Sequence, residues 1–168
     1  MRTLWILRHA KAAPHSPRDH GRPLAARGRR QTTELAAHLQ GLASRPSLVL
    51  SSSATRALET AQGVLEALGE EAELVVAPAL YEADADEVID IVRRTDDERT
   101  DLMVVGHNPT FLELAQLVLG PDDTEGRRQL QSGLPTGALT VTDFDVDRWA
   151  KVSAGGGQLV ELFVPRAR

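Results

Sequence analysis

The 168-residue sequence contains no cysteine. A disulfide framework, a thiolate nucleophile and a cysteine-based metal site are therefore excluded, although the absence of cysteine does not itself fix the compartment. Long hydrophobic runs are also missing. The longest, residues 74–80, contains Pro78 and is far shorter than the roughly 20 residues that a membrane helix needs. We therefore expect no membrane-spanning segment.

The N-terminus lacks the hydrophobic region of a secretory signal. Only four apolar residues, Leu4–Leu7, precede Arg8, and this stretch is too short for such a region. We therefore expect a cytoplasmic protein. The length and the 42% content of hydrophobic residues suit one packed core, so residues 1–168 are predicted to form a single domain, with a monomer as the default state.

Acidic residues are nearly absent from the start of the chain. Residues 1–33 hold eight Arg or Lys and a single acid, Asp19, whereas residues 34–168 hold eleven basic residues and twenty-three acids. The formal net charge of −5 thus averages a basic segment and an acidic body. The overall acidity argues against nucleic-acid binding, because a phosphate-backbone binder usually has a basic surface over the whole domain.

Short apolar runs rich in branched residues alternate with longer stretches of helical periodicity, which is typical of an α/β domain with a mainly parallel sheet. The predicted strands are residues 3–7, 47–50, 74–77, 101–105, 137–144 and 158–164. No helix separates the last two, so they are expected to form an antiparallel hairpin. The predicted helices are residues 24–42, 54–68, 84–94 and 108–119, while residues 121–135 are interpreted as a long polar loop with room for a short helix.

Local signals mark several helix ends. Asp84 and Glu87 have the spacing of a capping box. Asn108 is a suitable N-cap, and Pro109 suits the first position of the helix that would follow. Gly69 is the residue type favoured just past a helix C-terminus, so it marks the end of the second helix.

Polar side chains follow three of the predicted strands directly. Arg8 and His9 come after the first strand, residues 51–56 after the second, and residues 106–108 after the strand at 101–105. Ligands of open α/β sheets bind beyond the carboxyl ends of the strands. If these three strands are neighbours, two arginines and two histidines converge there: Arg8, Arg56, His9 and His107.

Such a cluster favours an anionic ligand, because packed cations repel one another and lose solvation unless an anion compensates. Arginine presents a planar fork of donors that matches phosphate oxygens, and the helix start after Asn108 adds partial positive charge. Neutral imidazole can attack phosphorus, and arginines can stabilise the charge that a metal stabilises elsewhere. Metal binding by His9 and His107 is the competing interpretation. However, both lie beside arginine rather than carboxylates, and no HExxH spacing occurs.

Four segments of the sequence resemble the histidine phosphatase superfamily, the phosphoglycerate mutase-like group. Residues 7–10, Leu-Arg-His-Ala, are similar to its RHG signature. Residues 51–61 resemble its second arginine motif, and residues 105–109, Val-Gly-His-Asn-Pro, resemble the second histidine motif of the small SixA-type phosphohistidine phosphatases. Residues 22–24 with Gly28 are similar to the RPL-T-x-x-G stretch of that branch. The resemblance covers residues 3–120 in order.

The resemblance implies a three-layer α/β/α sandwich of the phosphoglycerate mutase-like type, with a mainly parallel sheet and an antiparallel C-terminal hairpin. It implies that His9 is the phosphorylated nucleophile and that Arg8, Arg56 and His107 complete the phosphate pocket. Two departures stand out. Ala10 replaces the usual glycine, and Asn108 occupies the place where acid phosphatases and phytases of the superfamily carry an aspartate proton donor.

The proton donor for the leaving group is therefore open. Glu82 lies where phosphoglycerate mutase-like members place an acidic residue, so it is a candidate; the alternative is that Glu82 and Asp84 belong to the cap of the following helix. Lys11, Arg18 and Arg22 follow the nucleophile. Arg22 is kept as a possible substrate contact, although a surface charge is the favoured interpretation of all three.

The expected function is a metal-independent, cofactor-free phosphatase that passes through phospho-His9. A weak or missing acid favours a leaving imidazole over an alkoxide, and the chain has no insertion long enough for a lid. We therefore expect the substrate to be phosphohistidine on a protein, such as a histidine-phosphotransfer domain, steered by the basic segment. The alternatives are a phosphatase of a small phosphate ester and a phosphate- or phosphoprotein-binding module without turnover.

Overall fold

The computed structural model describes residues 1–167 and is built on one six-stranded sheet with the order β3-β2-β4-β1-β5-β6. Its strands are β1 (Arg2–Arg8), β2 (Leu48–Ser51), β3 (Glu73–Val76), β4 (Asp101–Gly106), β5 (Leu139–Phe144) and β6 (Gly157–Phe163). The first four strands along the chain run parallel, whereas β5 pairs antiparallel with both β1 and β6. The predicted parallel sheet and the antiparallel hairpin are thus confirmed.

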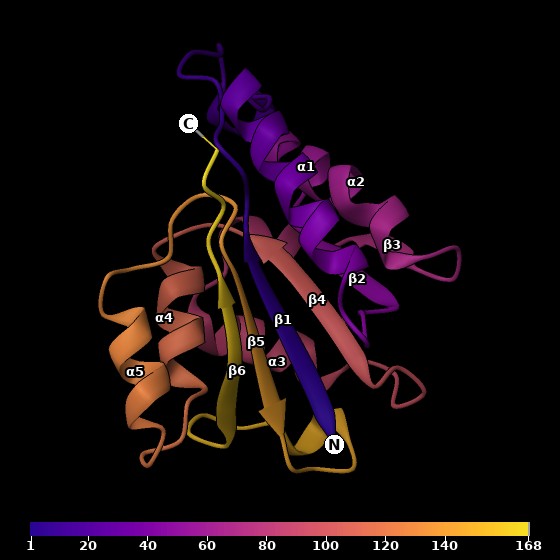
Figure 1. Cartoon of the computed structure of the whole chain (residues 1–168), viewed down its shortest axis with the longest axis vertical. Helices are drawn as coiled ribbons and strands as arrows, with labels where there is room; N and C mark the ends of the chain where they lie inside the picture. The colour runs from indigo at the N-terminus through magenta and orange to yellow at the C-terminus, as the bar shows by residue number, and fades with distance from the viewer. Residues whose placement is uncertain (168) are drawn as a thin grey trace.

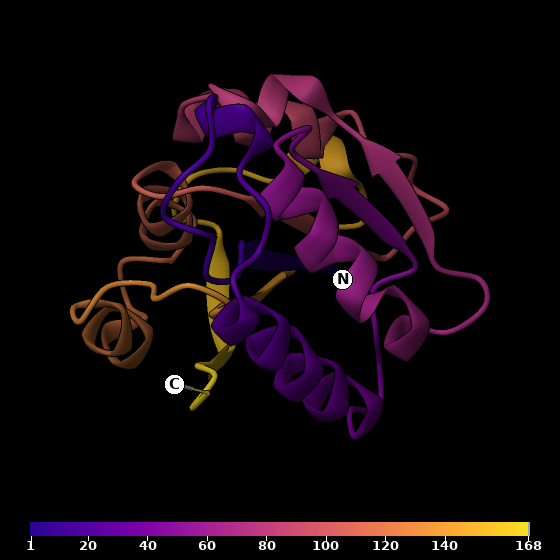
Figure 2. The same cartoon turned by 90° about the horizontal axis from the view of Figure 1, so that it is seen from above.

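Helices cover both faces of this sheet (Figures 1 and 2). They are α1 (Ala26–Gln40), α2 (Thr55–Leu68), α3 (Ala85–Arg93), α4 (Thr110–Leu117) and α5 (Thr124–Leu130), with short 3-10 turns η1 (Asp19–Gly21), η2 (Pro78–Tyr81) and η3 (Trp149–Lys151). Helices α1 and α2 bury one apolar cluster against the sheet, around Trp5 and Leu35, and α3 and α4 bury another around Ile6 and Phe111. Successive side chains of β1 point to opposite faces, so each face receives alternate residues of the same strand.

The local signals were read correctly except at α4. The Asp84–Glu87 capping box is present at α3, and α5 lies inside the segment predicted as a polar loop. The prediction of Asn108 as N-cap and Pro109 as first helical residue is wrong, because Pro109 is the N-cap and α4 begins at Thr110. The Asn108 amide instead bridges two segments, accepting from the Leu112 N–H and donating to the Leu134 carbonyl.

The strand order places three loop starts side by side. Strand β4 lies between β2 and β1, with Arg8 opposite Gly106 and Ser51 opposite Val105. The chain stays paired one residue beyond these strands. The His9 N–H donates to the Gly106 carbonyl at 2.9 Å, and the Ser52 N–H donates to the Val105 carbonyl at 2.9 Å. The polar residues that follow β1, β2 and β4 therefore begin next to one another at the same edge of the sheet.

Helix α1 holds the segment that follows His9. The Lys11 N–H donates to the Gln31 side chain at 2.8 Å, and the Lys11 carbonyl accepts from the Ala25 N–H at 2.9 Å. This approach depends on Gly28. A Cβ added there would meet the Lys11 carbonyl oxygen and lie 3.0 Å from its carbonyl carbon. The glycine therefore lets the helix touch the backbone just beyond the cluster.

We expect Gly28→Ala to destabilise the fold by about 1–3 kcal/mol, because an added methyl group in a closed contact forces the backbone apart. The free energy of unfolding from urea denaturation measures this loss. Gly41→Ala is the matched control at the end of the same helix, since a Cβ there has its nearest contact at 3.4 Å. Equal stability of Gly28→Ala and the wild type would contradict the proposed packing.

Candidate active site

Four side chains predicted to converge do lie together beyond the carboxyl edge of the sheet. The ring centroids of His9 and His107 are 5.2 Å apart, and Arg56 Nε donates to His9 Nε2 at 3.3 Å. Arg8 ends β1 directly before His9 and is half-buried. His9 and Arg56 are only 7% and 6% exposed, respectively. The structure thus confirms the convergence of Arg8, His9, Arg56 and His107.

The hydrogen bonds of His9 define its tautomer. Its Nδ1 lies 2.7 Å from the Ala10 carbonyl oxygen, which can only accept, so Nδ1 carries the proton. The Nε2 atom faces the Arg56 N–H donor and therefore presents its lone pair. The Ala10 N–H in turn donates to Thr60 Oγ1 at 2.9 Å, which fixes the carbonyl-bearing segment to α2. His9 is thus held with an unprotonated nitrogen toward the arginine.

His107 is oriented by a serine that follows β2. Its Nε2 lies 2.7 Å from Ser52 Oγ, and Ser52 is fully buried. The other ring nitrogen, Nδ1, is buried without a hydrogen-bond partner, and so is Nε of Arg8. A buried polar atom without a partner costs about 1–3 kcal/mol. An anion accepting hydrogen bonds between these residues would offset that cost.

Both histidines are neutral in this environment. Burial is the main cause that lowers the pKa of His9 to about 3, and the nearby His107, Arg56 and Arg8 lower it further against the Ala10 hydrogen bond. Burial likewise lowers the pKa of His107 to about 4, with Arg56 adding repulsion. At neutral pH the positive charge of the cluster therefore comes from arginine, and both imidazoles are uncharged.

The carbonyl of Leu134 fixes Arg8 from a loop that sequence reasoning left unassigned. Arg8 Nη1 donates to it at 2.9 Å, and Asn108 Nδ2 donates to the same oxygen at 2.9 Å. Burial lowers the pKa of Arg8 from its ordinary value. The segment between α5 and β5 thus forms one wall of the site, and no residue type in it signals this role, because only a backbone carbonyl is used.

A hydrogen-bonded rim on the solvent side of the cluster is formed by Asp19, Arg22 and Tyr81. The sequence did not identify Asp19 as part of the site. Its carboxylate accepts from Tyr81 Oη at 2.6 Å, from Arg56 Nη2 at 3.1 Å and from Arg22 Nη2 at 2.9 Å. Tyr81 also lies edge-on to His107, with centroids 5.5 Å apart. Arg22, kept as a possible substrate contact, is therefore placed at the rim rather than beside His9. The one available signal was that Asp19 is the single acid in a basic segment.

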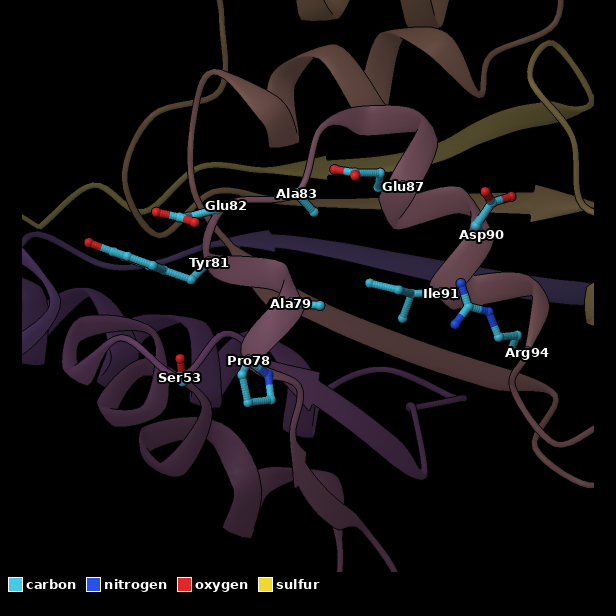
Figure 3. A pocket seen from close by; sticks show the side chains of 10 residues that line it. All are labelled: Ser53, Pro78, Ala79, Tyr81, Glu82, Ala83, Glu87, Asp90, Ile91 and Arg94. Atoms are coloured by element: carbon cyan, nitrogen blue, oxygen red, sulfur yellow. The ribbon is translucent and has the colours of Figure 1, made fainter.

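Glu82 follows Tyr81 at the end of η2 and is exposed. Figure 3 shows the Glu82 and Tyr81 side chains pointing the same way, away from Glu87 and Asp90 on α3. Both line a cavity of about 560 Å³ that also reaches Ser53 and Arg94. Glu82 thus stands near the rim, with no hydrogen bond to the four clustered residues in the described chain, and its role as proton donor stays a prediction.

The side chains around His9 and His107 differ from those of a metal centre. Within residues 1–167, no group of three or more His, Asp or Glu side chains is placed to hold a metal ion. The donors around His9 and His107 are guanidinium and hydroxyl groups rather than carboxylates, which suits an anion.

Within residues 1–167, no helix combines the length and apolarity needed to cross a bilayer.

We expect the imidazoles of His9 and His107 to stay neutral at pH 5. Their pKa values lie below the ordinary 6.5, so between pH 6.5 and about 4 the unfolded chain binds protons there that the native chain does not. This contribution to stability is therefore complete above pH 6.5 and is lost as the pH falls through that window. NMR titration of the ring protons checks the prediction, with His9→Gln and His107→Gln assigning the signals. A midpoint near 6.5 for either ring would contradict it.

Comparisons with known proteins agree with this geometry. The model of the histidine phosphatase superfamily (branch 1) matches residues 4–101. A protein of Mycobacterium tuberculosis is 36% identical over 163 residues, which cover 95% of this chain and 100% of that protein. A protein of Mycobacterium leprae is 31% identical over 166 residues, with 95% and 100% covered.

Solved structures share the whole fold. The SixA protein of Nakamurella multipartitia has a TM-score of 0.85 at 27% identity, covering 99% of this chain and 97% of that chain. The SixA protein of Agrobacterium tumefaciens has a TM-score of 0.82 at 29% identity, with 98% of both chains covered. These matches confirm the α/β/α fold of the phosphoglycerate mutase-like type. The chain belongs to the histidine phosphatase superfamily and is of the SixA type.

Proposed function

We propose that this protein is a metal-independent phosphatase that forms a phosphohistidine intermediate on His9 and dephosphorylates phosphohistidine in a protein. The observation that carries the proposal is the state of His9. Its Nδ1 proton is bound by the Ala10 carbonyl, and its Nε2 lone pair faces Arg56, in a site where both histidines are neutral. A neutral imidazole with a directed lone pair is a competent nucleophile toward phosphorus.

The first step transfers the phosphoryl group to His9. The Nε2 lone pair forms a bond to phosphorus while the bond from phosphorus to the leaving nitrogen breaks, and that nitrogen keeps the electron pair and takes up a proton. In the second step the oxygen of a water molecule attacks phosphorus and loses a proton, and the bond to Nε2 breaks. Inorganic phosphate leaves, and His9 regains its neutral form. Two displacements thus replace one difficult hydrolysis.

The other residues stabilise the phosphoryl oxygens during both steps. Arg56 already donates toward His9 Nε2, so its guanidinium borders the place where phosphorus would bind. Within this cluster, Arg8 Nε and His107 Nδ1 are buried and have no hydrogen-bond partner. They are therefore the natural donors to the remaining oxygens, His107 when Nδ1 carries its proton. Preformed donors aimed at developing charge supply what Mg²⁺ supplies in many phosphotransferases.

The preference for phosphohistidine rests on proton demand. No acidic side chain of residues 1–167 forms a hydrogen bond with His9 or His107, and Glu82 is exposed at the rim. An imidazole leaves readily once its nitrogen is protonated, whereas an alkoxide needs a strong acid at the moment of bond breaking. We assign Glu82 as the group that protonates the leaving nitrogen. The partner would then be a phosphorylated protein such as a histidine-phosphotransfer domain. We further propose that the phosphatase acts as a monomer in the cytoplasm.

Two solved structures described as phosphohistidine phosphatases, at 27% and 29% identity, support the phosphohistidine class. A solved structure of the protein histidine phosphatase SixA complexed with tungstate shares the fold of this chain, with a TM-score of 0.72 at 23% identity. Other chains of the same fold are described as phosphatases of small esters, including an α-ribazole phosphatase of Shigella flexneri, with a TM-score of 0.61 at 17% identity. A small phosphate ester is therefore the second candidate substrate.

The deciding experiment offers the purified protein a phosphorylated histidine-phosphotransfer domain and phenyl phosphate, each with excess EDTA. We expect the phosphoprotein to be hydrolysed with EDTA present, and His9→Ala to lower the rate by about 10³-fold or more, because the nucleophile is removed. Trapping with labelled substrate should give an acid-labile phosphate on the wild type and none on His9→Ala.

Each outcome separates one part of the proposal. Turnover of phenyl phosphate alone would favour the small-ester function, and turnover of neither substrate would leave only a binding module. Activity that requires added metal would contradict the metal-independent mechanism. Undiminished turnover by His9→Ala would remove His9 as the nucleophile. Thr33→Ala is a suitable control variant, because this exposed residue lies on α1 away from the cluster.

A further inference from the structure

Asp19 lies on the outer side of Arg56, one guanidinium away from the nucleophilic nitrogen. Arg56 Nε faces His9 Nε2, whereas Nη1 and Nη2 donate to the backbone carbonyl and the carboxylate of Asp19 at 2.9 and 3.1 Å. The side chain of Arg56 is 7% exposed, but that of Asp19 is 53% exposed. Asp19 therefore stands between the buried cluster and the solvent.

The direction of phosphoryl transfer gives this position a chemical meaning. The attacking and leaving atoms lie roughly in line on opposite sides of phosphorus. Because His9 is buried, the leaving group must lie on the outer side, at the rim formed by Asp19, Arg22 and Tyr81. A charge held at this rim is therefore near the leaving group rather than near the three phosphoryl oxygens.

We propose that Asp19 determines which leaving groups the site accepts. Its fixed negative charge favours a leaving nitrogen that gains positive charge as it is protonated, and disfavours phosphate esters whose leaving group carries a carboxylate. This inference rests on the proposed phosphatase function and names its selectivity residue. Arg22 and Arg56 form ion pairs with Asp19 that offset part of its charge, but they also fix its position. The carboxylate therefore faces each incoming substrate in the same place.

The charge of Asp19 persists under all ordinary conditions. The Tyr81 hydroxyl has the largest effect and, together with Arg56 and Arg22, lowers the pKa of the carboxylate to about 2 against the opposing effect of burial. Asp19 is consequently ionised throughout the range in which the protein would be assayed. It cannot serve as the proton donor, and its effect on selectivity should not vary between pH 5 and 8.

A purely structural role for Asp19 makes a different prediction. If the carboxylate only aligned Arg56, its removal would slow every substrate by the same factor, because Arg56 contacts the phosphoryl group common to all of them. A selectivity role changes the ratio between substrates instead. The ratio is therefore the informative quantity, and it is independent of the fraction of active protein.

The test compares the wild type with Asp19→Asn, which removes the charge but keeps the shape and one acceptor oxygen. Three substrates are used: the phosphorylated histidine-phosphotransfer domain, whose phosphohistidine carries no free α-carboxylate, phenyl phosphate, and 4-carboxyphenyl phosphate. In Asp19→Asn we expect kcat/KM for the carboxylated ester to rise about tenfold relative to kcat/KM for phenyl phosphate. Relative to the same reference, kcat/KM for phosphohistidine should fall severalfold. Changes of this size are expected for one unit charge near a partly exposed site. The intrinsic reactivities of the two esters cancel, because each ratio is compared between two proteins.

Matched variants complete the design. Asp122→Asn removes the same charge from an exposed residue beyond α4, at the opposite end of the sheet, and should leave all three ratios unchanged. Asp19→Ser repeats the measurement if Asp19→Asn proves unstable to thermal unfolding. Ratios that stay constant while all rates fall would overturn the selectivity role. Failure of the wild type to hydrolyse phosphohistidine would instead count against the proposed function, and the ester pair would still report on Asp19.

Discussion

The burial of a neutral imidazole beside two guanidinium groups is the constraint on which the rest of the site depends. A charged His9 would face repulsion from Arg8 and Arg56 with little water to compensate, so the native structure keeps it unprotonated. The Ala10 carbonyl then fixes the remaining proton on Nδ1 and leaves the Nε2 lone pair directed toward Arg56. Thr60 anchors the Ala10 N–H to α2, the helix that also carries Arg56. His9 and Arg56 are thus positioned by the same helix.

Much of this arrangement could be predicted from the sequence because it depends on strand order. Residues that directly follow parallel strands meet at one sheet edge, and the neighbours β2, β4 and β1 bring Arg56, His107 and His9 together. The loop paths could not be predicted in this way. Asp19 reaches Arg56 only because the chain after His9 makes an excursion that an antiparallel bridge between Ala12 and Leu24 closes.

Other contributions were hidden because they carry no distinctive residue type. The Leu134 acceptor is a backbone carbonyl, so the residue type at position 134 gives no sign of its role. Ser52 stands in a run of three serines, and only its position after β2 selects it as the partner of His107. Asn108 shows the opposite error. Its residue type suggested a helix cap, but its amide is used to join α4 to the Leu134 loop.

The basic N-terminal segment acquires a more specific meaning from these contacts. Arg8 and Arg22 belong to the site and its rim, whereas Arg27 and Arg29 donate to backbone carbonyls at Ala167 and Leu24. Part of the positive charge is therefore structural and does not face a substrate. Lys11 and Arg18 remain exposed on the excursion that borders the mouth. They are the residues of this segment best placed to attract a phosphorylated, acidic surface over the distance that salt permits.

The chemistry of the leaving group connects these features. Asp19 is ionised and cannot donate a proton, His9 is the proposed nucleophile, and His107 is neutral with its Nε2 engaged by Ser52. An enzyme with such a site gains most from a substrate whose bond to phosphorus breaks with little acid catalysis. A phosphorylated imidazole is such a substrate, because its nitrogen is basic enough to be protonated from solvent or from an exposed carboxyl such as Glu82. The same rim that lacks a buried acid holds the Asp19 carboxylate, which stabilises the positive charge produced by that protonation. The proposed substrate class therefore fits the arrangement of charges in the site.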